Sequence, residues 1–494
     1  MLESAEVGHT LSKAAFARQE PRLREALLNA QFDLSQSGRG PVLMIISGVE
    51  GGGRSETANK LTEWMDPRHI RVNAFGPRSC EEEARPPAWR YWRALPPKGK
   101  LGIFLNAWYT EMVAARLAGK LDETGFEIYL QETRLYERML ADEGVVLLKF
   151  WIHLSKRALR ARLDEFERHR RQHAAPYRLD VRRTRDYQKL RPLWEEMLRE
   201  TSTADAPWTV VEGEDDRYRN FTVGKVLLDA MTRIIAEKPT AVRRAIGAGP
   251  APSVVDNVRL VRELDMSRKV SARDYAKDLP KWQGRLAAAT AHKRFRDHAL
   301  ILAFEGADAA GKGGAIRRVT GALDARQYVS VPIAAPTEEE KRYPYLWRFW
   351  RSVPPRGGIT IFDRTWYGRV LVERVEGFAT EFDWRRAYDE INQFEEQLVD
   401  DGVVLCKFWL QISKAEQYRR FKAREKASFK RFKITPDDWR NRAKWGAYEH
   451  AVADMVDRTS SELAPWTLVE AEDKYFARIK ILKTIVRRLE AAVI

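Results

Sequence analysis

Cysteine and long apolar runs are nearly absent from this 494-residue chain. Its two cysteines, Cys80 and Cys406, belong to no CxxC pattern, which argues against a disulfide framework or a zinc site. No run of about 18 apolar residues occurs, so we expect no membrane-spanning helix and no membrane partner. The first residues, MLESAEVGHTLSK, lack the basic and apolar regions of a signal peptide. The cytoplasm is therefore the expected compartment.

Acidic residues are outnumbered by basic ones. The chain has 86 Lys and Arg against 70 Asp and Glu, a net charge of +16, and its pI is near 9.7. A basic excess of this size favours polyanionic partners, such as nucleic acid, anionic lipid or phosphate-rich small molecules. The alternative is a charge that serves only solubility.

The chain repeats itself at an offset of 258 residues. Residues 89–119 and 347–377 are identical at 13 of 31 positions, and DEGVVLLKFW in the first half becomes DDGVVLCKFW in the second. A constant offset over most of each half indicates two copies of one fold. The segment GAGPAPS at 247–253 is typical of a linker. The predicted organisation is a first domain over 1–240, a linker over 241–269 and a second domain over 270–494.

Each copy alternates short apolar strands with helices. In the second copy, strands are expected over 299–304, 327–333, 359–363, 403–410 and 466–470. Helices are expected over 311–323, 366–376, 383–401, 413–426, 436–459 and 473–491. Charged helical segments at 11–36 and 272–296 precede the two copies. This alternation predicts an α/β fold with a mostly parallel sheet covered by helices on both faces, which binds ligands at the carboxyl ends of its strands.

The second copy is organised around the sequence ALILAFEGADAAGKGG at 299–314. Its apolar run breaks into Gly306-x-x-x-x-Gly311-Lys312, and a helix-compatible stretch follows. In such a loop, backbone N–H groups, the helix N-terminus and the lysine together attract phosphate. The Ser or Thr that usually follows the lysine and holds magnesium is replaced here by Gly313. The alternative is a tight turn that needs glycine only for its positive φ.

The two copies differ where the second carries charge. The third strand of the second copy ends in Asp363 and Arg364, whereas the first copy has Leu105 and Asn106 there. A carboxylate that ends an apolar strand beside a glycine loop is typical of a magnesium ligand in phosphoryl-transfer proteins. Asp308, inside the loop, adds a second oxygen donor. Asp308 and Asp363 are therefore the predicted metal ligands.

Basic residues near this strand end are expected to neutralise a transferring phosphoryl group. Arg364 and Arg369 are the candidates, whereas in the first copy Arg54 replaces Lys312 at the glycine loop. The losses in the first copy predict that it is degenerate and non-catalytic. The alternative for Asp363 and Arg364 is a structural ion pair at a strand end.

A basic segment at 417–433, QYRRFKAREKASFKRFK, contains eight Lys or Arg and one acid. Its position after the fourth strand predicts a mobile lid over the phosphates. Arg420 and Arg424 are four residues apart and so share one helix face. The alternative is a solvated helix face, but the counterpart at 159–173 dilutes its positive charge with three acids.

Several motifs together resemble one family. The loop GADAAGKGG, the strand FDRTWYGRVLVERV, the motif WRFWRSVPPRG and the tail KITPDDWRNRAKW are similar to those of the family-2 polyphosphate kinases. The resemblance covers 270–490 and, more weakly, 11–236. The tandem arrangement resembles the branch known as polyphosphate:AMP phosphotransferases, which transfer the terminal phosphate of inorganic polyphosphate to AMP and give ADP.

The resemblance implies a thymidylate-kinase-like P-loop fold in two tandem copies, Mg²⁺ as cofactor, and inorganic polyphosphate and AMP or ADP as partners. The catalytic positions that it implies are Asp308, Lys312, Asp363, Arg364 and Glu373. Motifs and resemblance together give a polyphosphate-binding set of Gly306, Gly311, Gly313, Arg369, Arg420 and Arg424. No specific nucleic acid is expected as a partner. Because family members associate through equivalent domains, the resemblance also implies an internal pseudo-dimer, with a homo-oligomer left open.

Three other functions stay open at this point. A nucleotide kinase with ATP as donor fits the glycine loop, although the missing Ser or Thr and the long basic segment count against it. An enzyme of the same family that acts on ADP or GDP, or that runs towards polyphosphate synthesis, fits equally well. A non-catalytic polyanion- or RNA-binding protein fits the net charge, but it has no need of Asp308, Lys312 and Asp363 together.

Overall fold

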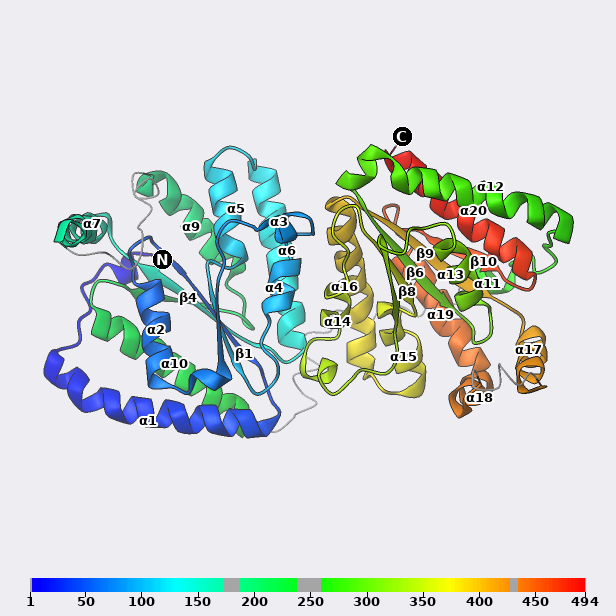
Figure 1. Cartoon of the computed structure of the whole chain (residues 1–494). Helices are drawn as coiled ribbons and strands as arrows, with labels where there is room; N and C mark the ends of the chain where they lie inside the picture. Colours follow the sequence, from blue (N-terminus) through cyan, green and yellow to red (C-terminus); the bar gives the residue numbers. More distant parts are fainter. Residues whose placement is uncertain (1, 173–185, 238–258, 427–433, 494) are drawn as a thin grey trace. The chain divides into compact units, whose positions relative to one another are not determined.

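A computed structural model describes residues 2–172, 186–237, 259–426 and 434–493. The chain divides into two compact units (Figure 1). The first consists of 1–78, 90–239 and 337–347, and the second of 79–89, 240–336 and 348–494. The predicted linker falls largely on residues outside the described ones. The predicted boundaries therefore stay a prediction, as do the pseudo-dimer and any homo-oligomer.

The first unit is built on a five-stranded parallel sheet. Its strands are β1 (Val42–Gly48), β2 (Ile70–Ala74), β3 (Leu101–Leu105), β4 (Val146–His153) and β5 (Trp208–Glu212). Their order across the sheet is β2-β3-β1-β4-β5, and every pair is parallel. The central strand β1 is buried along almost its whole length, as its unbroken apolar run requires when helices cover both faces of a sheet.

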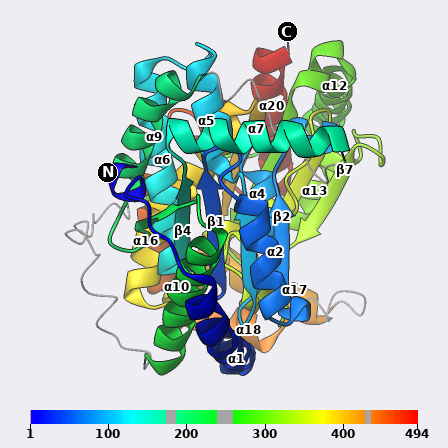
Figure 2. The same ribbon diagram turned by 90° about the vertical axis from the view of Figure 1, so that its left-hand side faces the viewer.

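Helices cover both faces of this sheet. The α-helices of the first unit are α1 (Lys13–Ser37), α2 (Arg54–Trp64), α4 (Trp89–Ala94), α5 (Trp108–Leu117), α6 (Glu123–Asp142), α7 (Lys156–Gln172), α9 (Tyr187–Thr201) and α10 (Asp216–Ala236). The short helix α3 (Cys80–Glu83) clusters with the second unit. Short 3₁₀ helices are η1 (Leu2–Ala5) and η2 (Pro67–His69). Helices α1 and α10 lie side by side along one face (Figures 1 and 2).

The second unit repeats this plan. Its strands are β6 (Ala299–Gly306), β7 (Tyr328–Pro332), β8 (Ile359–Asp363), β9 (Val403–Gln411) and β10 (Trp466–Glu470). The order is β10-β9-β6-β8-β7, again with all pairs parallel. The strand that leads into the glycine loop therefore lies between β8 and β9. Connections leave it in opposite directions across the sheet, and this is where open α/β sheets bind ligands.

The helices of the second unit also cover both faces of its sheet. They are α11 (Arg259–Arg262), α12 (Ala272–Ala291), α13 (Lys312–Thr320), α14 (Trp347–Trp350), α15 (Val372–Glu376), α16 (Glu381–Asp400), α17 (Lys414–Lys426), α18 (Pro436–Ala443), α19 (Trp445–Thr459) and α20 (Lys474–Val493), with 3₁₀ helices η3 (Lys293–Asp297) and η5 (Trp366–Arg369). A further 3₁₀ helix, η4 (Glu340–Arg342), clusters with the first unit. Helices α12 and α20 run side by side on one face, and α16 and α19 pack together on the other (Figure 1).

The predicted α/β fold in two copies is confirmed, and each predicted strand of the second copy is present. Two predicted helices are each divided: 366–376 becomes η5 and α15, and 436–459 becomes α18 and α19. No helix in the part of the chain that the structure describes is long and apolar enough to cross a membrane.

Candidate active site

The glycine loop begins where β6 passes close to β9. Gly306 has φ +151°, and a Cβ added there would lie 2.6 Å from the carbonyl oxygen of Leu410, so only glycine fits. Gly311, with φ +115°, precedes α13, and nothing lies within 4 Å of the place of its missing Cβ. Lys312 begins α13, and its Nζ donates to the Gly306 carbonyl at 2.7 Å. The loop therefore has an open side, with a lysine ammonium held over its own backbone.

A buried carboxylate fixes the turn after β8. Phe304 pairs with Asp363 in the sheet, so the end of β8 lies beside the end of β6. Arg364 has φ +66°, a strained value for a residue with a side chain. The backbone N–H and the hydroxyl of Thr365 both donate to Glu305, at 2.7 and 2.9 Å. These two hydrogen bonds hold the strained turn and so orient the side chains of Asp363 and Arg364.

Glu305 is fully surrounded by protein. Burial raises the pKa of its carboxyl group, while Lys312, the donation from Thr365 and the charge of Arg364 act in the opposite direction. The pKa of Arg364 is raised: burial alone would lower it, but Asp308, Glu305 and Asp363 outweigh that effect. Acidic groups therefore surround the guanidinium at the point where a phosphoryl group would arrive.

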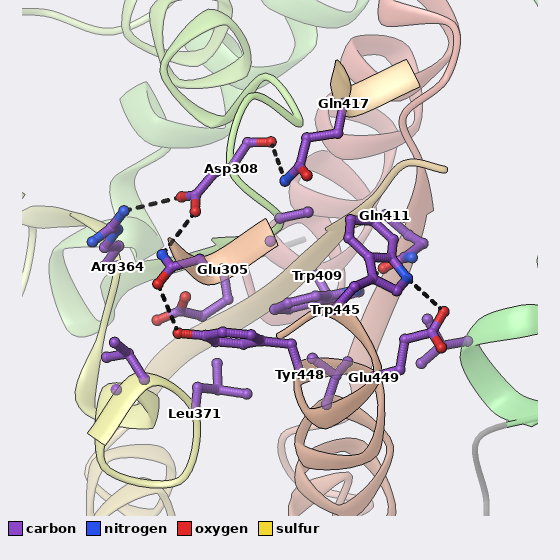
Figure 3. Close-up of a pocket in the computed structure, with 17 residues that line it drawn as sticks. Glu305, Asp308, Arg364, Leu371, Trp409, Gln411, Gln417, Trp445, Tyr448 and Glu449 are labelled. Carbon is purple, nitrogen blue, oxygen red and sulfur yellow. Dashed lines mark hydrogen bonds and ion pairs between the residues drawn. The ribbon is translucent and has the colours of Figure 1, made fainter. Parts of the chain in front are cut away.

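Asp308 is held from three sides (Figure 3). One carboxylate oxygen accepts from Arg364 Nη2 at 3.1 Å, and the other accepts from Asn441 Nδ2 at 2.9 Å. Its backbone carbonyl accepts from Gln417 Nε2 at 3.2 Å. Asn441 in turn accepts from the hydroxyl of Tyr448 at 3.2 Å. Residues of α17, α18 and α19 thus fix the acid that the sequence places in the glycine loop.

A basic groove of about 540 Å³ opens over the loop. The basic residues that line it are Lys312, Arg317, Arg364, Arg419, Arg420, Arg424, Lys474 and Arg478. The acids that line it are Asp308, Asp363 and Asp438. Burial lowers the pKa of both Arg424 and Lys474. A groove with this excess of positive charge, some of it partly desolvated, suits a chain of phosphates.

Arg420, a predicted polyphosphate-binding residue, lines the groove and is held by the protein itself. Its side chain is 5% exposed, and its Nε donates to Glu416 at 2.5 Å. Its Nη1 donates to the carbonyls of Ala309 and Ala310, and its Nη2 donates to those of Ala471 and Glu472. A guanidinium has five N–H donors, and here all five are engaged. These contacts anchor α17 to the glycine loop, and the polyphosphate-binding role of Arg420 stays a prediction.

Arg369 and Glu373 form an ion pair at 3.0 Å. Among the described residues, neither lines the basic groove, and neither lines the second pocket described next. Of the other residues predicted to bind polyphosphate, Gly311, Gly313 and Arg424 line the groove, whereas Gly306 lines the pocket beside it. Their role in polyphosphate binding stays a prediction. The lid predicted over 417–433 stays a prediction, and 427–433 lie outside the described residues.

An aromatic pocket of about 100 Å³ adjoins the groove (Figure 3). The residues that form its walls are Val261, Leu371, Val372, Trp409, Trp445, Tyr448 and Val452. The indole of Trp445 donates to Glu449 at 2.9 Å, and Arg262 pairs with the same carboxylate at 2.9 Å. Asp308 and Arg364 line both the pocket and the groove. Two ligands, one flat and one highly charged, would therefore meet at these two side chains.

The corresponding loop of the first unit is internally neutralised. Arg54 pairs with Glu50 at 2.7 Å and donates to Asn106 Oδ1. Leu105 ends β3 where Asp363 ends β8, and it is buried. Asn106 retains the positive φ of Arg364, at +55°. The turn is therefore preserved without the charges that it displays in the second unit.

A guanidinium also fills the open side of the first unit's loop. Arg219 is buried and donates to Thr57 Oγ1 at 2.9 Å and to the carbonyl of Gly213 at 2.9 Å. A Cβ added at Gly53 would lie 2.2 Å from Arg219 Nη1, whereas the space beside Gly311 is open. The residue 258 positions after Arg219 is Ala477, which lines the basic groove. One substitution, alanine to arginine, thus blocks the phosphate side of the loop.

Sequence reasoning missed several side chains of this site. Glu305 directly precedes Gly306, and a comparison of the copies would have found it, because the first copy has Ser47 there. Asn441 and Tyr448 lie more than 130 residues from Asp308, so no local pattern connects them to this acid. Arg219 lies within helix α10, and no motif in the sequence of that helix connects it to the glycine loop.

Comparisons with known proteins agree with this geometry. The family model described as Polyphosphate kinase 2 matches residues 10–239 and 269–494. The chain is 53% identical, over 492 residues, to the polyphosphate:AMP phosphotransferase of Pseudomonas aeruginosa, covering 100% of this chain and 99% of that protein. It is 40% identical to the polyphosphate:AMP phosphotransferase of Acinetobacter johnsonii over 96% of each chain. A crystal structure of a polyphosphate kinase 2 from Pseudomonas aeruginosa matches with a TM-score of 0.90 at 51% identity, covering 100% of this chain and 99% of that one. The resemblance predicted from the motifs is thereby confirmed: the chain belongs to the polyphosphate kinase 2 family.

Proposed function

We propose that the chain transfers the terminal phosphate of inorganic polyphosphate to AMP, giving ADP, and that the second unit catalyses this step. The observation that carries the proposal is the junction of two unlike sites at Asp308 and Arg364. The basic groove suits the polyphosphate donor. The aromatic pocket suits the flat base of the acceptor, because aromatic side chains stack on planar rings. The names of the full-length relatives support the same reaction.

The reaction needs no strong general base, because the attacking oxygen belongs to the phosphate of AMP and is already anionic. That oxygen forms a bond to the terminal phosphorus of polyphosphate. The bridging P–O bond to the rest of the chain breaks, and the shortened polyphosphate leaves as an anion. Catalysis then rests on alignment and on neutralisation of charge. Arg364 is placed for this at the junction, and Lys312 is placed at the glycine loop.

The acids of the groove fit Mg²⁺, which prefers one or two carboxylates and completes its shell with phosphate oxygens and water. Asp308 and Asp363 both line the groove. Among the described residues no three His, Cys, Asp or Glu side chains form a ready metal cluster, which agrees with a metal that arrives with its phosphate ligands. When bound, the metal would withdraw negative charge from the reacting phosphates.

Asp363→Asn tests the proposal. It removes a carboxylate charge without changing the shape of the side chain. We expect a loss of ADP formation from AMP and polyphosphate of about a hundredfold or more, with an unchanged melting temperature. The assay compares polyphosphate with ATP as donor, and AMP with ADP and GDP as acceptors, in the presence of Mg²⁺. Near-normal turnover by this variant would remove Asp363 from the mechanism.

Matched variants assign the reaction to one unit. Lys312→Ala is expected to abolish transfer, whereas Arg54→Ala, at the corresponding position of the first unit, is expected to retain it. Equal losses in both variants would overturn the assignment to the second unit. A wild-type protein that binds polyphosphate but forms no nucleoside diphosphate would instead support the non-catalytic alternative.

A further inference from the structure

The first unit contains a pocket of about 80 Å³ that no part of the proposed reaction uses. Its lining includes Val113, Ala114, Trp151, Trp194 and Met197. It therefore has aromatic and aliphatic walls, as does the acceptor pocket of the second unit, which has a similar volume.

The two pockets occupy the same place in the repeated fold. Eleven lining residues of one pocket correspond to lining residues of the other at the offset of 258. In the first unit they are Ser47, Gly48, Val49, Glu50, Thr110, Val113, Ala114, Trp151, Leu159, Leu190 and Trp194. In the second unit they are Glu305, Gly306, Ala307, Asp308, Gly368, Leu371, Val372, Trp409, Gln417, Tyr448 and Val452. A correspondence of this extent is not expected of a packing defect. The pocket of the first unit is the counterpart of the acceptor pocket.

The first unit has this pocket but lacks the open phosphate side of the glycine loop. Arg219 fills the open side of the glycine loop, as described above, and Leu105 replaces the strand-end acid. Arg54 lines the pocket, but it is paired with Glu50 and bonded to Asn106. A phosphate dianion would have to displace the Glu50 carboxylate from Arg54. The charge balance therefore disfavours a nucleotide and favours an uncharged ligand.

One buried polar group in the pocket, the Ser47 hydroxyl, makes no hydrogen bond to the described residues. Ser47 lines the pocket and is only 3% exposed, and its hydroxyl has no hydrogen-bond partner among the described residues. In the second unit the same position is Glu305, which Thr365 satisfies, whereas the counterpart of Thr365 is Ala107. A buried hydroxyl without a partner costs free energy, and a ligand that hydrogen-bonds to it would recover that cost.

We propose that the first unit binds an uncharged planar heteroaromatic molecule, a nucleoside or free nucleobase, in the pocket beside Ser47. The flat ring lies against the aromatic walls, and a ring or ribose polar atom bonds to the Ser47 hydroxyl. This inference rests on the proposed function, because it takes the counterpart pocket to be the site of the AMP base. It makes the first unit a binding domain that senses a dephosphorylated relative of the acceptor.

Adenosine is the probe, used with the full-length chain in calorimetric titration. The matched variants are Ala114→Trp, which covers the pocket of the first unit, and Val372→Trp at the corresponding position of the second. Ala114 is exposed, so the added indole should not disturb the core. We expect Val372→Trp to retain one equivalent of bound adenosine while losing turnover. We expect Ala114→Trp to lose that equivalent while turnover is unchanged.

Ser47→Ala provides a second test that does not depend on adding bulk. In the Val372→Trp background it should weaken adenosine binding by about two- to tenfold, as expected for one lost hydrogen bond. A crystal soaked with adenosine should show the ring beside Ser47. AMP should bind at this site no more tightly than adenosine.

Three results would overturn the inference. These are absence of adenosine binding in Val372→Trp, unchanged binding after Ala114→Trp is added to it, and binding of AMP without adenosine. Failure of the proposed function looks different, because it appears as wild-type protein that forms no ADP from AMP and polyphosphate, whatever adenosine does.

Discussion

Replacing Arg420 with alanine separates an anchoring role from a phosphate-binding role. The side chain links α17 to the glycine loop and to the end of β10 through four carbonyl oxygens and the Glu416 carboxylate. Alanine would leave four carbonyls without that donor, in a place where the guanidinium is 5% exposed and water has little access. Hydrogen bonds to a charged donor contribute about 1.5–3 kcal/mol each, but they are not additive.

The expected loss follows from comparable buried networks. Breaking a buried, hydrogen-bonded charge network by removing one partner costs about 3–5 kcal/mol. For a domain of this size each kcal/mol lowers the melting temperature by about 2–4 °C, so the transition of the second unit should fall by about 6–20 °C. Differential scanning calorimetry measures this shift. Initial-rate kinetics at varied polyphosphate concentration measure KM at a temperature where both proteins are folded.

Arg419→Ala is the matched control. Arg419 is the neighbouring residue, is 68% exposed, pairs with the same Glu416 and lines the groove. Its loss should change stability by no more than about 1 kcal/mol, because exposed ion pairs contribute little, and should raise KM for polyphosphate. If Arg420→Ala instead melts within about 1 °C of wild type and raises KM as Arg419→Ala does, the anchoring role is refuted and the direct phosphate contact is restored.

Two further predictions concern stability. Burial lowers the pKa of His153, so the unfolded chain takes up this proton first and stability falls as pH drops below about 6.5. His153→Gln, which introduces the residue found at position 411, should reduce the fall in melting temperature between pH 7.5 and 5.5, and an unchanged fall would exclude His153 as its source. In the second unit, Lys407 donates to Glu395 at 2.6 Å, with both side chains buried. Glu395→Gln should lower the free energy of unfolding, measured in urea, by about 3–5 kcal/mol. The double variant Lys407→Met with Glu395→Leu should recover most of that loss. A double variant as unstable as Glu395→Gln would contradict this account.

The strands and the glycine loop could be predicted because each depends on residues that are neighbours in the chain. An unbroken apolar run such as 299–304 has no polar face to expose, so it forms a buried central strand. Gly306 and Gly311 mark the turn that follows, because both adopt positive φ. The position of Asp363 beside this loop follows from parallel pairing, which brings the carboxyl ends of neighbouring strands to one edge.

Helical spacing, by contrast, gave only a shared face and not the surroundings of each side chain. Arg420 and Arg424 are four residues apart. The guanidinium of Arg420, however, donates to the carbonyls of Ala309 and Ala471, which are distant from it in the sequence. Arg369 and Glu373, which were assigned separately from the sequence to phosphate binding and to catalysis, pair with each other at the same spacing. Charge counts and helical spacing therefore do not tell which arginine has its donors engaged by protein carbonyls.

The sequence by itself determined the duplicated fold, the phosphate loop and the loss of charge from the first copy, because these are properties of local pattern and of an internal comparison. Only the tertiary structure decided which buried groups support the site. Glu305, Asn441 and Arg219 act on residues that are 60, 133 and about 160 positions away. Such contacts arise from the packing of helices against the sheet edge, and no spacing along the chain encodes them.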